Sequence, residues 1–375
     1  MAGIYIHIPF CKSICHYCDF YKVLDEDNHS RFINAVLLEA KLRKDYLSGE
    51  SVSTIYLGGG TPSVLSVKEL SDLIDGLYGI FNVENDCEIT IEVNPDDVGI
   101  EWLNEIRKIG FNRLSYGIQS WNDDILRMLN RRHTSKQAAE ALIFSEKAGF
   151  ENISVDLIYG IPGYDSASWG KDLEQTFGYN IKHLSAYHMT IKPETFFGKL
   201  KKAGKLNELD EEESNNQFNL LIEKAENAGF IQYEISNFAK EGWFSKHNSN
   251  YWRQVIYIGL GPSAHSFNRI SRQWNISNLE KYISAVESNK KFYTREELDN
   301  KKIFNEYILT SLRTMWGIDL DYIEINFSKE GYDYVMNLSR KFIDYGLMRL
   351  ENNHLVLTNT GKMISDNIIS EFMMV

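Results

Sequence analysis

The chain has 375 residues, of which 43% are hydrophobic and 25% are charged, and its formal net charge is −12. This composition is that of a globular protein and excludes a fibrous or disordered chain, while the length predicts about two domains or one large barrel with an appendage. No apolar run approaches the roughly 20 residues that cross a bilayer, and the acidic balance argues against nucleic acid as a partner. The first apolar strand has no basic leader before it, so we expect a cytoplasmic protein.

Six β-rich segments follow one another in the first half of the chain, at residues 4–8, 54–60, 88–94, 113–119, 153–160 and 183–189. Helical patterns lie between them, at about 31–46, 67–77, 102–109 and 138–148, and the last two run into Gly110 and Gly149 as stops. Strands that alternate with crossover helices predict a parallel sheet of the α/β class. Six units rather than eight predict a partial (β/α)6 TIM-like barrel that is open on one side.

The pattern changes from residue 199 onward. A charged stretch leads into a helix that ends near Gly229, and an aromatic-rich stretch follows at 232–267. The last part predicts helices and a hairpin, with Asn352 and Asn353 as its turn and a final helix after Thr358, which is a winged-helix-like layout. We therefore expect a barrel at 1–198, an extension of the barrel at 199–290 and a C-terminal domain at 291–375.

Three of the four cysteines, Cys11, Cys15 and Cys18, stand in one loop after the first strand. An odd cluster of this kind in an intracellular chain predicts metal binding rather than disulfides. Zinc would require a fourth ligand, with His7 or His16 nearest, whereas an iron–sulfur cluster held by three cysteines leaves one iron open to a small molecule. We expect the fourth cysteine, at the opposite end of the barrel, to be a buried thiol.

In a parallel barrel the chemistry lies at the carboxyl ends of the strands. Polar residues collect at those ends here: the cysteines after the first strand, residues 58–61 after the second, Glu92 on the third, Gln119 on the fourth and Asp156 on the fifth. A carboxylate within an apolar strand is costly without a partner, which favours a functional role for Glu92 and Asp156. We expect all these groups to converge on one mouth.

The spacing C-x3-C-x2-C with GGGTP after the second strand resembles the radical S-adenosylmethionine (SAM) superfamily. In that superfamily the open iron of a 4Fe-4S cluster binds the amino and carboxylate groups of SAM. Nearly the whole chain resembles one branch of it, which contains oxygen-independent coproporphyrinogen III oxidases and heme chaperones, through the segments YIHIPFC, YLGGGTPS, EVNPDD, RLSYGIQS, LNRRHT, VDLIYGIPG and YEISNFA.

The resemblance assigns roles to particular residues. It implies that Cys11, Cys15 and Cys18 hold the 4Fe-4S cluster. The SAM-binding residues that it implies are Tyr5, Tyr17, Gly59, Gly60, Thr61, Glu92, Gln119, Arg131 and Asp156. It does not decide between one SAM molecule and two.

Two features separate the members of this branch. The oxidases carry a further cysteine, as C-x3-C-x2-C-x-C, and a long N-terminal extension, whereas this sequence has Phe20 at that position and begins four residues before Tyr5. The segment HNSNYW at 247–252 resembles the HNxxYW signature that is associated with heme binding in the chaperones. It implies His247 as a ligand of heme iron, since a neutral histidine nitrogen suits that metal, with Tyr251 and Trp252 as flat partners of the macrocycle.

The resemblance therefore implies a heme chaperone rather than a turnover enzyme. Such a protein binds heme as cargo and delivers it to apo-hemoproteins, among them respiratory ones at the membrane face. It would be cytoplasmic or peripheral at the cytoplasmic membrane, and a homodimer is compatible with it. The alternative that stays open is radical oxidative decarboxylation of coproporphyrinogen III, or another radical reaction on a tetrapyrrole.

Overall fold

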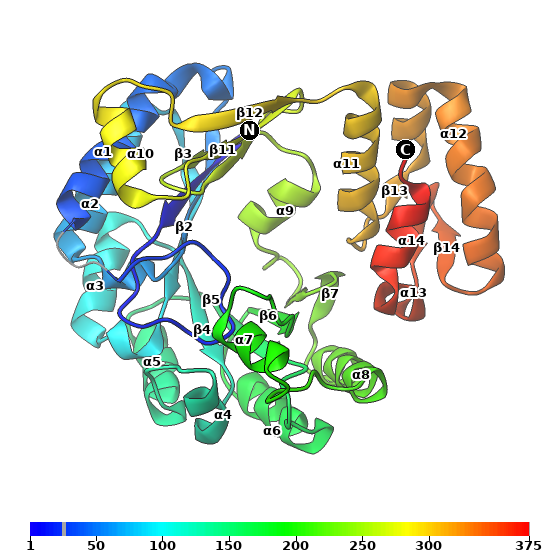
Figure 1. Ribbon diagram of the computed structural model, residues 1–375, viewed down its shortest axis with the longest axis horizontal. Coiled ribbons are helices and arrows are strands. Elements are labelled where there is room, and N and C mark those ends of the chain that lie inside the picture. Colours follow the sequence, from blue (N-terminus) through cyan, green and yellow to red (C-terminus); the bar gives the residue numbers. More distant parts are fainter. Residues whose placement is uncertain (25–27, 375) are drawn as a thin grey trace.

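The computed structural model describes residues 1–24 and 28–374, and its main feature is one large mixed sheet (Figure 1). Among the described residues this sheet has 12 strands in the order β12-β11-β10-β9-β1-β2-β3-β4-β5-β6-β8-β7. The neighbours from β1 to β6 are all parallel. These six strands are β1 (Ala2–Ile8), β2 (Val52–Gly59), β3 (Val83–Val93), β4 (Arg113–Gln119), β5 (Asn152–Tyr159) and β6 (His183–His188). The predicted partial barrel is confirmed.

Helices cover the outer face of the parallel strands (Figure 1). Alternate strand residues such as Ile4, Ile6 and Ile8 are fully buried in the core, because they face these helices. Gly110 and Gly149 both have positive φ and end their helices as predicted. The helices and short 3-10 turns up to residue 227 are α1 (His29–Leu42), η1 (Lys44–Leu47), η2 (Pro62–Val64), α2 (Val67–Ile80), η3 (Pro95–Asp97), α3 (Ile100–Ile109), α4 (Asp123–Met128), α5 (Ser135–Lys147), α6 (Ser166–Phe177), α7 (Phe196–Lys202) and α8 (Glu211–Asn227).

The sheet continues beyond both edges of the six parallel strands. At one edge β8 (Asn237–Ala239) pairs antiparallel with β6, and β7 (Ile231–Glu234) pairs with β8. At the other edge β9 (Tyr257–Leu260) pairs in parallel with β1. The antiparallel strands β10 (His265–Phe267), β11 (Ser271–Asn275) and β12 (Tyr293–Glu297) follow it, with α10 (Leu279–Glu287) after β11.

The aromatic-rich stretch contains the short helix α9 (Lys246–Trp252), which lies between the barrel and the C-terminal domain (Figure 1). Ser245 caps its first turn by accepting a hydrogen bond from the backbone N–H of Asn248. The carboxylate of Glu88, on β3, accepts two more, from the N–H groups of Lys246 and His247. A negative charge at the start of a helix satisfies its free N–H groups and its dipole, so Glu88 fixes α9 against the barrel.

The C-terminal domain, which begins with α11 (Asn300–Leu312) in Figure 1, has its own hydrophobic core, with members from Phe304 to Phe372. Its hairpin turns at Asn352 and Asn353, both of positive φ, and Thr358 caps the next helix, as predicted. Its elements are α11 (Asn300–Leu312), β13 (Ile318–Asp319), α12 (Leu320–Asp344), which is interrupted at Phe327 and Ser328, β14 (Met348–Glu351), β15 (His354–Leu357), α13 (Asn359–Met363) and α14 (Ser365–Phe372). In the part of the chain that the structure describes, no helix combines the length and the apolar character needed to span a membrane.

Candidate functional site

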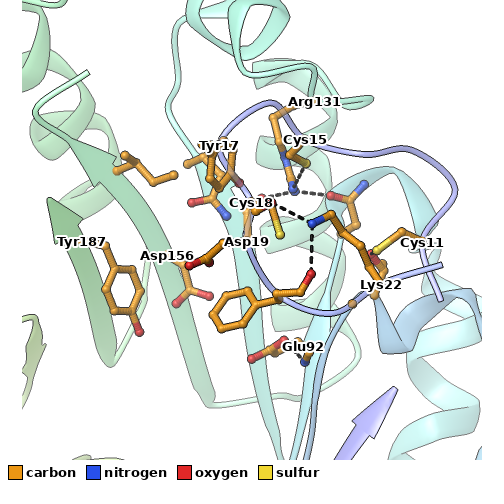
Figure 2. Close-up of a pocket in the computed structure, with 18 of the residues that line it drawn as sticks. Cys11, Cys15, Tyr17, Cys18, Asp19, Lys22, Glu92, Arg131, Asp156 and Tyr187 are labelled. Atoms are coloured by element: carbon orange, nitrogen blue, oxygen red, sulfur yellow. Dashed lines mark hydrogen bonds between the residues drawn. The ribbon is translucent and has the colours of Figure 1, made fainter. Parts of the chain in front are cut away.

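A cavity of about 380 Å³ opens at the carboxyl ends of the parallel strands (Figure 2). Eleven of the predicted site residues line it: Cys11, Cys15, Cys18, Tyr17, Gly59, Gly60, Thr61, Glu92, Gln119, Arg131 and Asp156. They come from the loops or ends of five different strands. The structure therefore brings together groups that lie as far as 145 residues apart in the sequence, between Cys11 and Asp156.

Each cysteine of the loop after β1 has a donor or a cation close by. The hydroxyl of Thr61 donates to the sulfur of Cys11 at 3.4 Å, and a guanidinium nitrogen of Arg131 donates to that of Cys15 at 3.4 Å. The ammonium group of Lys22 binds the backbone carbonyl of Cys18 at 2.7 Å (Figure 2). Burial raises the pKa of the Cys11 and Cys18 thiols. Donors and positive charge stabilise thiolates, so the loop suits sulfur ligands of a metal centre.

Neither of the two histidines that we considered as the fourth zinc ligand, His7 and His16, lies among the residues that line the cavity. His7 is bound on one ring nitrogen to the hydroxyl of Tyr5 and on the other to the carbonyl of Tyr21. His16 bonds the carbonyl of Met128 and packs on Phe196. Across residues 1–24 and 28–374, no three His, Cys, Asp or Glu side chains stand close enough to hold a single ion. The donor set fits an iron–sulfur cluster with three cysteine ligands and one open iron.

The glycine turn after β2 joins the cysteine loop through two backbone bonds. Gly60 donates its N–H to the carbonyl of Ile8, and Thr61 donates to that of Phe10. A Cβ on Gly60 would lie 2.7 Å from both carbonyl oxygens, and Gly59 has φ of +106° with the ring of His7 against it. From the sequence we expected these glycines to make room for a ligand. The structure shows that they are also required by contacts within the protein.

Glu92 lies on the inner face of β3 beside the glycine turn. Its two oxygens accept from the hydroxyl of Tyr56 at 2.8 Å and from the N–H of Gly59 at 3.1 Å. Burial, together with the nearby carboxylate of Asp156, raises the pKa of Glu92 to about 7, although these hydrogen bonds act in the opposite direction. A carboxylate has about four acceptor positions, so Glu92 can still accept hydroxyl groups from a ligand in the cavity.

Asp156 stands on β5 across the cavity from the glycine turn. The hydroxyl of Ser115 donates to both of its oxygens, at 3.2 and 3.3 Å. Burial raises the pKa of Asp156, while the nearby guanidinium of Arg113 opposes that rise. Arg113 is itself 1% exposed, and its Nε and one terminal nitrogen have no hydrogen-bond partner among the described residues. The positive charge of Arg113 therefore lies inside the barrel beneath the carboxylates of the cavity.

Gln119, Arg131 and Tyr17 form another part of the wall. Gln119 ends β4 with φ of +68°, a conformation that is uncommon outside glycine and that often marks functional positions. Arg131 binds the carbonyl of Gly117 at 2.6 Å and the side-chain oxygen of Asn94, and its Nε has no partner within the described chain. Burial raises the pKa of the Tyr17 hydroxyl beside it. The wall thus presents both a fixed cation and an amide to the cavity.

Asp97 was not singled out as a site residue from the sequence, although it belongs to the segment EVNPDD. Its carboxylate binds Lys12 of the cysteine loop at 2.8 Å, Ser63 of the glycine turn at 3.0 Å and Arg132 at 3.0 Å. Burial works against ionisation, but the hydrogen bonds from Lys12 and Arg132 hold the pKa of Asp97 below its usual value. One carboxylate therefore ties together the loops that follow β1, β2 and β4.

Further lining residues lie at the mouth of the cavity. Lys22 and Tyr187 were missed by the sequence analysis because nothing in their local sequence marks them, and Asn248, although it belongs to HNSNYW, was not predicted to line the cavity. Phe20 also lines the cavity and is 65% exposed. At the other end of the barrel Cys87 is buried, as expected, and burial raises the pKa of its thiol to about 12.

The predicted heme ligand lies behind the cavity wall rather than on it. His247 is 2% exposed, and its ring nitrogens bind the hydroxyls of Thr54 at 2.8 Å and of Tyr251 at 2.9 Å. Tyr5, a predicted SAM contact, lies in the same layer, with its ring centre 6.5 Å from that of His247. Trp252 faces the guanidinium of Arg313 at 5.8 Å from the ring centre. The structure therefore separates Tyr5, His247, Tyr251 and Trp252 from the residues that line the cavity.

The partial barrel and the cysteine and glycine loops at its mouth define a radical SAM protein, and a family model described as the radical SAM superfamily matches residues 5–175. The chain is 31% identical over 377 residues to the heme chaperone HemW of Bacillus subtilis (strain 168), which covers 100% of this chain and 99% of that protein. It is 35% identical over 265 residues to the heme chaperone HemW of Escherichia coli (strain K12), which covers 70% of this chain and 69% of that protein. The chain belongs to the HemW family of radical SAM proteins.

A solved structure shares the fold over almost the whole chain. Coproporphyrinogen III oxidase (HemN) from Escherichia coli, a radical SAM enzyme, matches with a TM-score of 0.86 and 24% sequence identity, covering 99% of this chain and 90% of that one. The C-terminal domain and the extension of the barrel are thus part of the common architecture.

Proposed function

We propose that this chain is a heme chaperone, which binds heme and delivers it to apo-hemoproteins. The observation that carries this proposal is the place of HNSNYW in the fold. The segment forms α9, which packs against β2 of the barrel, and Asn248 reaches the wall of the cavity. The likeness to HemW proteins over the full length of the chain supports the same function.

His247 is the proposed ligand of the heme iron. Burial lowers the pKa of its imidazole to about 3, so the ring is neutral, which is the form that binds metals. The bond between one ring nitrogen and Thr54 would orient the ring. The other nitrogen is bonded to Tyr251, so iron has to replace the Tyr251 hydroxyl there.

The cavity holds the other two groups under this proposal. Cys11, Cys15 and Cys18 would hold the 4Fe-4S cluster, which, when bound, supplies an open iron for the methionine end of SAM. The glycine turn and Glu92 would hold the methionine and ribose ends of SAM, and Tyr17, Gln119, Arg131 and Asp156 would complete the pocket. These residues orient the cofactor and shield it from water.

We propose further that the receiving proteins are respiratory hemoproteins at the cytoplasmic face of the membrane. Cytoplasmic location and a homodimeric state stay predictions. Heme delivery is tested by mixing the heme-loaded protein with an apo-hemoprotein and measuring the heme absorption that the apo-hemoprotein gains.

Heme titration of the parent and of His247→Ala tests the ligand. We expect the variant to lose most of its affinity and the parent to show the spectrum of histidine-ligated heme. His354→Ala is the control, because this histidine lies in the C-terminal hairpin, far from the barrel. Equal affinity in His247→Ala and the parent would exclude His247.

A second variant keeps the test independent of folding. Tyr251→Phe retains the ring but removes the hydroxyl that occupies the histidine nitrogen, so we expect it to bind heme more tightly.

The alternative activity is tested in parallel, by supplying cluster-loaded protein with SAM, reductant and coproporphyrinogen III. Decarboxylated product would favour an oxidase over a chaperone.

A further inference from the structure

Tyr56 touches both proposed binding sites. It lies on β2 and lines the cavity, where its hydroxyl donates to Glu92 at 2.8 Å. Its ring stacks on the imidazole of His247, with ring centres 5.0 Å apart and an angle of 23° between the planes. One side chain therefore connects the carboxylate proposed to hold SAM with the histidine proposed to hold heme.

We propose that Tyr56 couples the two sites, so that SAM bound at Glu92 holds Tyr56 against His247 and opposes the binding of heme. This inference rests on the proposed function, because it takes SAM and heme as the two ligands. Tyr56 is a positioning residue in this scheme, since it acts on heme only through His247.

The first step of the coupling is at Glu92. Both of its oxygens already accept a hydrogen bond from the protein, one from Tyr56 and one from the N–H of Gly59, and the side chain also faces the cavity. Ribose hydroxyls of SAM that donate to the remaining acceptor positions favour the ionised carboxylate. A hydrogen bond to a charged acceptor is roughly twice as strong as a neutral one, so the Tyr56 hydroxyl is then held more firmly.

The second step is at α9. The ring of His247 is packed between Tyr56 and Tyr251 and bonded to Thr54. Heme iron can therefore reach the ring nitrogen only if α9 shifts. A firmly held Tyr56 stabilises the closed position of the ring, in which Tyr251 occupies the ring nitrogen. Because coupling between ligands is reciprocal, heme must weaken the binding of SAM by the same factor.

The affinity for heme, measured in cluster-loaded protein with and without saturating SAM, tests this proposal. We expect the dissociation constant for heme to rise about fivefold or more with SAM in the parent, which is the lower end of typical coupling between sites. In Tyr56→Phe the ring stays and the bond to Glu92 is lost, so the ratio of the two constants should fall to about one. A change in either affinity alone cancels in this ratio.

Tyr116→Phe is the matched control. Tyr116 is another tyrosine of the barrel strands; it is fully buried, and its hydroxyl bonds Ser145 on α5, away from the cavity. It should keep the coupling of the parent. No effect of SAM on heme affinity in the parent, a tighter binding of heme with SAM, or an equal ratio in Tyr56→Phe would each overturn the proposal.

A measurement without heme separates this proposal from the proposed function. SAM should slow the hydrogen exchange of backbone amides in residues 246–252 of the parent, and much less so in Tyr56→Phe. If SAM protects these amides but His247→Ala binds heme as the parent does, the heme ligand is wrong while the link through Tyr56 holds. If the amides do not respond to SAM, the link through Tyr56 is wrong.

Discussion

Gly60→Ala is predicted to disturb the cysteine loop without touching a cysteine. The added Cβ would lie 2.7 Å from the carbonyl oxygens of Ile8 and Phe10, whereas ordinary contact begins at 3.4 Å. Both contacts are with backbone, so a side-chain rotation cannot relieve them. Overpacking of this kind costs about 1–3 kcal/mol. The two backbone hydrogen bonds at this place, from Gly60 and Thr61, contribute about 1 kcal/mol each. We therefore expect a loss of about 3–5 kcal/mol in the free energy of unfolding if both hydrogen bonds break.

Urea unfolding of the metal-free protein measures this loss, and iron and sulfide per chain after anaerobic reconstitution measure its effect on the cluster. Gly79→Ala is the control, because no atom lies within 4 Å of its Cβ and alanine favours a helix over glycine. We expect Gly79→Ala to be at least as stable as the parent and to reconstitute fully. If Gly60→Ala matched it in both measurements, the glycine turn would not be required by the contacts described here.

Three further predictions concern the cavity and the loops around it. The pKa of Glu92 is about 7, and SAM is expected to bind the ionised carboxylate, so the affinity for SAM should rise with pH up to about 7 and then level off. Titration calorimetry should find a flatter pH profile of SAM affinity in Glu92→Gln. An unchanged slope in this variant would contradict the role of Glu92. Asp97→Asn should lower the free energy of unfolding by about 1–3 kcal/mol and reduce the iron retained on dilution, since its hydrogen bonds hold three loops together; full retention would refute this. Arg131→Met removes a positive charge and a hydrogen-bond donor from the surroundings of Cys15, so redox titration should find a more negative reduction potential of the cluster than in the parent. Arg131→Lys should have a potential between those of Arg131→Met and the parent. An unchanged potential in Arg131→Met would show that Arg131 does not act on the cluster.

The barrel could be predicted from the sequence because apolar residues recur with a different spacing in its strands than in its helices. Segments such as 113–119 alternate apolar and small or polar residues, and the helix before Gly110 shows helical spacing up to a residue that favours positive φ. These are local signals, and the structure has the predicted elements within a few residues. The rule that parallel strands end at one edge then placed the cysteines, Glu92 and Asp156 at one cavity.

The features that the sequence did not predict depend on contacts between distant segments. The parallel pairing of β9 with β1 joins residues 257–260 to residues 3–6, and no local pattern specifies such a partner. The burial of His247 against Thr54 and Tyr251 also depends on distant contacts, because the local sequence HNSNYW is equally consistent with an exposed loop. Asp97 resembles any acidic residue after a strand until Lys12, Ser63 and Arg132 are placed around it.

The way in which α9 is held at the barrel limits the routes by which ligands exchange. At the amino-terminal ends of the strands, Glu88 binds the start of α9, and the inner side chains of Thr90, Arg113 and His183 are at most 1% exposed. The cavity lined by the cysteine and glycine loops therefore opens at the carboxyl ends of the strands, beside the exposed ring of Phe20. A ligand that leaves at this end passes the cysteine loop, and a protein that covered this end would slow its departure. The rate at which bound SAM exchanges with labelled SAM would then report directly on whether a partner is docked.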